Sequence, residues 1–272
     1  MGSRRADHAL LLRSGRGNTG GAGLGRARGG LVVAQVALVA VLLVAAGLLG
    51  RSLWKLQRVE LGFDLDGVLA ITVARAKQMS PGTDEARRLF LDELVAEAQT
   101  VAGVTAAGMV QHLPLTGERS TTGYAVEGTE ITGGMDLRVA GGDFFAASGT
   151  AVVAGRSFTP ADNAAAPNVY IVNRALAKNL GGDVIGRRLA FEWGGVVDGR
   201  IVPVKITGDV VGVVEDVRES GPASPAAPAL YRPFAQHPRP TMTLVLRTRR
   251  DAADLARAVI ARIHALHPEH SL

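Results

Sequence analysis

The histidines are the residues of this sequence best suited to metal binding or acid–base chemistry. The sequence contains His8, His112, His237, His264, His267 and His270. The last three are spaced three residues apart, which would place them on one face of a continuous helix. Pro268 interrupts any such helix, and we find no carboxylate or cysteine placed to complete a ligand set. We therefore expect solvated C-terminal histidines and predict no metal site.

Acidic and amide side chains offer a second set of candidates for chemistry. Glu215 and Asp216 could form an acid pair beside Arg218, but they follow the apolar run VVGVV and are more typical of a strand end. We interpret the other candidates as helix caps and turn formers: Asp162, Asn163 and Asn173. The hydrolase motifs G-x-S-x-G and H-E-x-x-H do not occur. We therefore nominate no catalytic, cofactor-binding or metal-binding residue and expect a protein that is not an enzyme.

A glycine-rich segment near the N-terminus, GRGNTGGAGLG, invites comparison with phosphate-binding loops. It has neither G-x-x-x-x-G-K-[ST] nor an intact G-x-G-x-x-G, and no strand precedes it. We interpret residues 14–30 as a flexible, positively charged linker and expect no nucleotide cofactor. The chain also contains no cysteine, which excludes disulfides, cysteine-ligated zinc, iron–sulfur clusters and a thiol nucleophile.

The positive charge of the chain is confined to its N-terminal tail. The formal net charge is +5, and all of it lies in residues 1–30, where six arginines stand against Asp7 alone. The remainder of the chain is electrically balanced. A nucleic-acid-binding surface on the globular part is therefore not expected.

An apolar run, LVVAQVALVAVLLVAAGLLG, follows the tail and predicts a transmembrane helix over residues 31–52. Its first 20 residues carry no charge, and a helix of that length spans about 30 Å, the thickness of a bilayer core. Arg51 and Trp54 resemble interfacial anchors. Two alternatives remain, a buried helix of a soluble protein and a cleaved signal peptide, although the run is longer than an ordinary signal-peptide core.

The charges that flank the apolar run predict its orientation. Six arginines precede it, whereas the basic residues that follow are diluted by acidic ones. This asymmetry favours a cytoplasmic N-terminus for a single-pass protein of the inner membrane. The globular part would then lie in the periplasm or another space outside the cytoplasm.

The residues beyond the apolar run predict an α+β domain over 60–272. Strand and helix patterns alternate at both ends of the domain around a β-rich middle. We expect helices after Thr83, after Asn173 and after Asp251, each with that residue as its N-cap. We assign 67–128 and 242–267 to an outer lobe with one shared sheet, and about 136–217 to an inserted lobe. Asp198-Gly199 predicts a hairpin turn.

Several segments, taken in order, resemble a known family. They are the apolar run with its exit GFDLDGVL, VAGVTAAGMVQHLPLTG, GRSFTPADNAAAPNVYIVNRALAKNL, GDVIGRRLAF, ITGDVVGVVEDVRESG, ALYRPFAQ and MTLVLRTRRD. Their order and spacing resemble FtsX-type ABC transporter permeases with a MacB-like periplasmic core domain, closest to the acidobacterial duplicated orphaned permease type. The family often has other motifs where this chain has Gly142-Asp143-Phe144-Phe145 and Gly181-Gly182-Asp183.

The resemblance implies a transport component whose outer domain couples to export or to mechanotransmission. It also implies a separate ABC ATPase and further permease helices or a second copy, because no second apolar run of membrane-spanning length occurs before Leu272. We expect either a fragment of a longer permease or a partial subunit. The alternative is a membrane-anchored binding or assembly module without a transport role.

Overall fold

The computed structural model describes residues 21–57, 62–64, 66–74, 84–130, 133–197, 200–219, 221 and 223–266. The chain forms two compact units, Met1–Val59 and Glu60–Leu272. Thr83, the proposed cap, and the Asp198-Gly199 turn lie outside the described residues, although β7 and β8 pair up to Val197 and Arg200 on either side of that turn.

The first unit contains a single described element, the helix α1 (Gly21–Gln57). Its segment Arg28–Lys55 is, among the described residues, the one helix long and apolar enough to cross a membrane. The large apolar side chains of this segment are exposed, as those of Leu43 and Leu49 show. The helix begins at Gly21, so the prediction of a flexible linker is wrong for residues 21–30. Alanine, leucine and arginine between the glycines of this stretch favour helix, and they extend a long helix that is already nucleated.

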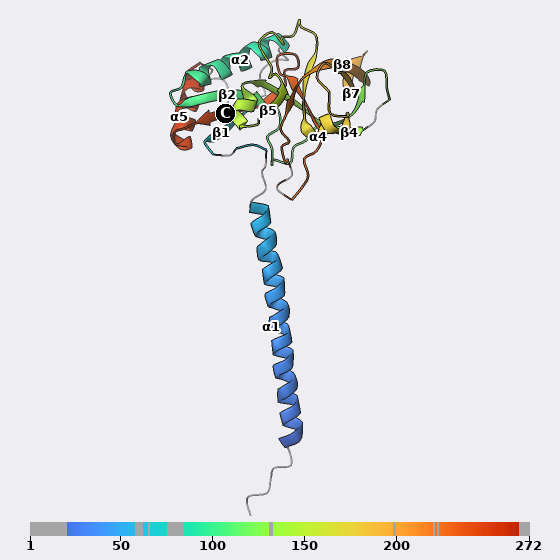
Figure 1. Cartoon of the computed structure of the whole chain (residues 1–272). Coiled ribbons are helices and arrows are strands. Elements are labelled where there is room, and N and C mark those ends of the chain that lie inside the picture. Colours follow the sequence, from blue (N-terminus) through green and yellow to red (C-terminus); the bar gives the residue numbers. More distant parts are fainter. Residues whose placement is uncertain are drawn as a thin grey trace, which may run out of the picture. The chain divides into compact units, whose positions relative to one another are not determined.

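The second unit is an α+β domain, as predicted, and part of it is a layered sheet (Figure 1). Strand β10 (Thr241–Thr248) lies between β1 (Val68–Ala74) and β2 (Val104–Val110) and is antiparallel to both. Helix α2 (Asp84–Thr100) connects β1 to β2, and α5 (Ala252–Leu266) follows β10. We call these strands and helices, together with α3 (Phe144–Ser148), the sheet lobe.

The core of the sheet lobe follows from the alternation of side chains along its strands. Ala107 and Met109 face α2 and α5 and join their buried leucines and valines in one apolar cluster. Val110 belongs to a second cluster on the opposite face, where α3 packs Phe144 and Phe145 against the sheet. The sheet is therefore covered on both faces.

The remaining strands close into a ring. Strand β4 (Gly133–Gly142) pairs with β2 near its C-terminal end, with β3 (Thr121–Val126) near its start, and with β9 (Ala229–Pro233) between them. The ring continues from β3 through β7 (Arg188–Val197), β8 (Arg200–Val214) and β6 (Val169–Asn173) back to β9. Strand β5 (Val152–Gly155) pairs with β8 outside this path. We call the ring, with α4 (Arg174–Asn179), the ring lobe.

The pairing of β3 corrects one predicted lobe boundary. The predicted outer lobe included residues 121–126, but β3 pairs with β4 and β7 and so belongs to the ring. The sequence pattern also predicts no strand at 229–233, although β9 closes the ring. The ring closes where β4 pairs with β9, and these segments lie about a hundred residues apart in the sequence. Hydrophobic periodicity is a local pattern and cannot predict such a pairing. The other predicted bounds of the lobes and of the 60–272 domain stay predictions.

Candidate binding groove

Among the residues that sequence analysis singled out, the described histidines lie apart from one another. His112 contacts Glu118 at 3.4 Å and Ser120 at 3.0 Å through its two ring nitrogens. His264 is exposed on α5, and His237 lies in the segment after β9. Within the described ranges, no group of three or more metal-ligating side chains comes together. His8, His267 and His270 lie outside these ranges.

The acid pair and the predicted caps hold loops and helix ends. Glu215 pairs with Arg174 at 2.9 Å, and Asp216 accepts a hydrogen bond from the Ala175 backbone N–H at 2.8 Å. Both carboxylates therefore stand at the N-terminus of α4, where negative charge is favourable. Asn173 accepts a hydrogen bond from the Leu176 N–H at 3.0 Å, which confirms its predicted role as the N-cap.

Asp162 organises the loop between β5 and β6. Arg156 grips its carboxylate with two bonds of 2.7 and 2.8 Å, and the Thr159 N–H and hydroxyl donate two more. Burial of Asp162 opposes ionisation, but these hydrogen bonds outweigh it and hold its pKa below the usual value. Asn163 accepts a bond from the Ala165 N–H at 3.0 Å, which is the turn geometry predicted for it.

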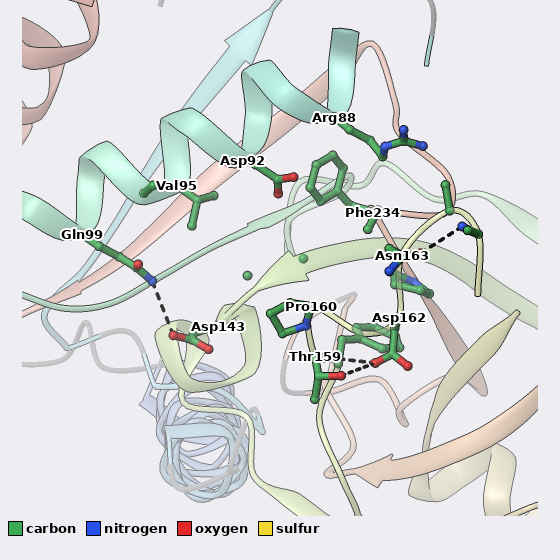
Figure 2. A pocket seen from close by; sticks show the side chains of 18 residues that line it. Arg88, Asp92, Val95, Gln99, Asp143, Thr159, Pro160, Asp162, Asn163 and Phe234 are labelled. Carbon is green, nitrogen blue, oxygen red and sulfur yellow. Dashed lines mark hydrogen bonds between the residues drawn. The ribbon is translucent and has the colours of Figure 1, made fainter. Parts of the chain in front are cut away.

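The loop that Asp162 organises forms one wall of a groove that opens between the two lobes (Figure 2). Helix α2 forms the facing wall with Arg88, Asp92, Val95 and Gln99, and the groove encloses about 650 Å³. The turn before α3 contributes Asp143, whose carboxylate accepts a long bond of 3.5 Å from the Gln99 amide.

The floor of the groove requires glycine. A Cβ atom at Gly141 would lie 2.5 Å from Cδ1 of Phe234, which also lines the groove. At Gly142 the backbone has φ +58, and a Cβ there would lie 3.1 Å from Val95. Only glycine lets β4 pass so close to both neighbours without strain. Of these two glycines, only Gly142 lies in a segment where the sequence departs from the family pattern.

The polar groups of the groove suit binding. Burial raises the pKa of the Asp92 carboxyl, and the charge of Arg88 opposes this shift. Asp162 is neutralised by Arg156, so Asp92, Asp143 and Arg88 are the charges that remain to meet a ligand. The one hydroxyl among the described lining residues is that of Thr159, and the carboxylate of Asp162 to which it donates is already held by two bonds from Arg156. The geometry therefore fits a polar ligand or a partner segment.

The groove could not be predicted from the sequence pattern. Its lining residues come from four separated segments, 88–99, 141–143, 158–165 and 233–235. Asp92 and Gln99 are ordinary residues on the polar face of an amphipathic helix. The one available signal was the clustering of Pro160, Asp162 and Asn163 in a loop. Such clusters mark turns far more often than binding sites.

Comparison with known proteins places these features in a wider group. The family model of the MacB-like periplasmic core domain matches residues 30–262. Among solved structures, the periplasmic region of MacB from Actinobacillus actinomycetemcomitans is similar, with 12% sequence identity, a TM-score of 0.48, and coverage of 76% of this chain and 86% of that chain. The extracellular domain of the noncanonic ABC-type transporter YknZ from Gram-positive bacteria is also similar, with 15% identity, a TM-score of 0.43, and coverage of 73% and 92%. The search of curated proteins found no match.

Proposed function

We propose that this chain is a non-enzymatic permease component. The premise is that the chain belongs to the family of MacB-like periplasmic core domains of ABC-type permeases. Its outer domain would couple to export or to mechanotransmission. A separate ABC ATPase would supply the energy, and further permease helices would act beside α1. The family model carries this proposal because it spans the apolar helix and both lobes without interruption.

The proposed location follows from the tail and from α1. We place α1 in the inner membrane, with the arginine-rich tail in the cytoplasm and the domain in the periplasm. The support is the excess of arginine before the apolar segment. In this arrangement α1 is the mechanical link between a cytoplasmic ATPase and the domain.

The groove supports a role in binding during that coupling. One wall is helix α2 of the sheet lobe, and the other is the loop that leads into β6 of the ring lobe. We infer that a displacement between the lobes would change the width of the groove. A ligand or partner that prefers one width would bias the lobes toward one arrangement.

The proposal is tested by isolating the full chain from membranes of its own cells in mild detergent. We expect an ABC ATPase to co-purify in a fixed ratio. A variant in which residues 28–55 are replaced by an unrelated membrane-spanning helix should keep the folded domain but lose most of the ATPase. If no ATPase accompanies the wild-type chain after chemical crosslinking in intact membranes, the alternative of an anchored module without transport is correct.

A further inference from the structure

Among the residues of this domain that the structure describes, two arginines are almost completely buried, and they differ in how their charge is balanced. Arg138 is 2% exposed, and Glu219 lies 2.8 Å from its Nη2. Arg232 is 1% exposed, but no described acidic side chain forms an ion pair with it. Its described contact is with the ring of Phe191, 5.1 Å from Cζ to the ring centroid. A cation–π contact offsets only part of the cost of burying a charge.

The two nitrogens of Arg232 that lack hydrogen-bond partners lie on one edge of its guanidinium. Both Nε and Nη2 are buried without a hydrogen-bond partner among the described residues. These two atoms share the edge that binds a pair of oxygens side by side. Arg119 shows this use within the same domain, where its Nε and Nη2 hold the Asp136 carboxylate at 2.9 to 3.1 Å.

The side chain of Arg232 points into the interior of the ring lobe. Strands β7 and β9 are not paired, so the contact between Arg232 and Phe191 crosses the interior. Tyr170 of β6 packs on the same ring, with centroids 5.7 Å apart, and its hydroxyl is also buried without a partner. A buried charge and a buried hydroxyl, both unpaired, therefore meet in this interior.

Two further buried nitrogens without partners belong to residues near Arg232 in the sequence. Nε2 of His237 and Nε of Arg239 are buried without partners, although both residues are partly exposed. Burial, with the charges of Arg232 and Arg239, lowers the pKa of His237 to about 3, so its imidazole is neutral at physiological pH. Arg239 stacks on Trp193, 4.9 Å from its Cζ to the ring centroid. His237 and Arg239 are thus partly exposed residues whose side chains lie close enough for the charges of Arg232 and Arg239 to act on the imidazole.

The charges around this cluster leave it positive. Burial and the charge of Arg239 lower the pKa of Arg232 to about 9, with Tyr170 opposing, so the guanidinium is still charged at neutral pH. Two described carboxylates act on this cluster. Burial lowers the pKa of Arg239, and the charge of Asp84 opposes this shift. Burial raises the pKa of Tyr170, and the charge of Asp209 adds to this shift. An unpaired buried cation with aligned donors is the arrangement that proteins use to bind oxyanions.

We propose that Arg232, Tyr170, His237 and Arg239 form a binding site for an oxyanion, either a carboxylate or a phosphate group. The Nε–Nη2 edge of Arg232 takes two oxygens of the anion, and the other three side chains donate to it from the sides. The ring interior supplies the low dielectric that makes these contacts strong. This site is separate from the groove and does not depend on the transport role.

The test is a titration of the purified full chain in neutral detergent with inorganic phosphate or acetate, at constant ionic strength balanced with chloride. We expect one of the two anions to bind saturably by calorimetry and to raise the melting temperature of the domain. Arg232→Gln should weaken this binding by at least about tenfold. Arg257→Gln, which changes an exposed arginine on α5, should bind as the wild type does.

The choice of anion and a second variant keep the test decisive. Binding of phosphate or of acetate identifies the chemical class of the natural ligand. If Arg232→Gln does not fold, Arg239→Gln should fold, because the residue is partly exposed, and should weaken binding about three- to tenfold. The proposal is overturned if neither anion binds the wild type, or if a folded Arg232→Gln or Arg239→Gln binds as tightly as the wild type.

Discussion

Single buried polar residues hold the loops that shape this domain. Asp162 and Asn173 are 4% and 2% exposed, and each makes several hydrogen bonds with nearby backbone or side chains. Buried polar groups stabilise a fold only while their partners are in place. The contribution of each residue can therefore be measured by removing its partners one at a time.

Asp162→Asn should lower the free energy of unfolding of the domain by about 1–3 kcal/mol at neutral pH. The substitution removes the negative charge that Arg156 grips and one of the oxygens that accepts its bonds. Denaturant unfolding of the full chain in detergent, followed by Trp193 fluorescence, measures the change. Asp183→Asn, at an exposed aspartate, should change the free energy by less than about 0.5 kcal/mol.

The effect of Asp162→Asn should also depend on pH. The pKa of Asp162 in the folded domain lies below the value of 3.8 expected for an unfolded chain. The stability that its charge contributes is therefore fully present above that pH and is lost as the pH falls toward the folded pKa. The difference between wild type and variant should shrink below about pH 4. A difference that stays constant down to unfolding would show that the charge contributes nothing.

Asn173→Ala should cost about 2–4 kcal/mol of unfolding free energy. The side chain caps α4 through the Leu176 N–H and also bonds to the Ala229 N–H and the Ala227 carbonyl at 2.9 and 2.8 Å. Asn163→Ala, in an exposed turn, is the matched control and should cost less than about 1 kcal/mol. Equal costs for the two variants would contradict the account.

Sequence alone predicted the local roles of residues but not their distant partners. Asn173 and Asp251 were identified as caps because capping depends on the next three residues, and Asp251 does accept from the Ala253 and Asp254 N–H groups. The unpaired edge of Arg232 could not be predicted. It depends on where β6, β7 and β9 meet, and β9 itself was missed.

At the scale of elements, the long helices and the regular strands followed from the sequence. The apolar run over 104–110 predicts a strand, and the structure has β2 there. The helix after Asn173 is also present as predicted, because its cap is local. The β-rich runs Ile201–Ile206 and Asp209–Val217 predict two strands, but the structure has one continuous strand, β8, from Arg200 to Val214. Gly208 accounts for the expected break, but in the structure it stays in the strand and makes room for the ring of Tyr170.

The membrane element gives a prediction that the cysteine-free sequence makes easy to test. Single cysteines are introduced at Ser14 in the tail and at Arg257, which is exposed on α5. A thiol reagent that cannot cross membranes should label the Arg257→Cys variant in spheroplasts and the Ser14→Cys variant only after lysis. The wild type, without cysteine, is the background control.

Other labelling results would correct the account of α1. The reverse labelling pattern would show that the domain is cytoplasmic. Loss of the tail from the mature chain, measured by its mass, would show that α1 is a cleaved signal peptide. Only the predicted pattern agrees with a helix that anchors the domain outside the cytoplasm.

At the scale of the whole molecule, the proposed function depends on one coupling, between a cytoplasmic ATPase and the two lobes of the domain. The state of a cytoplasmic ATPase is proposed to change the arrangement of the two lobes, and the groove between α2 and the loop around Asp162 reports that arrangement. Coupling between binding sites is reciprocal. A molecule that fills the groove should therefore also change nucleotide affinity.

The most direct test measures the width of the groove in the membrane complex with its ATPase. Spin labels on cysteines at Ala96 and Ala164, both exposed on facing walls, give this distance by pulsed electron paramagnetic resonance. Labels at Ala96 and Arg257, on the adjoining helices α2 and α5, give a control distance within the sheet lobe. The account predicts that trapping the ATPase with ATP and vanadate shifts the groove distance and leaves the control distance unchanged. Identical groove distances with and without trapped nucleotide, in a complex that retains its ATPase, would contradict it.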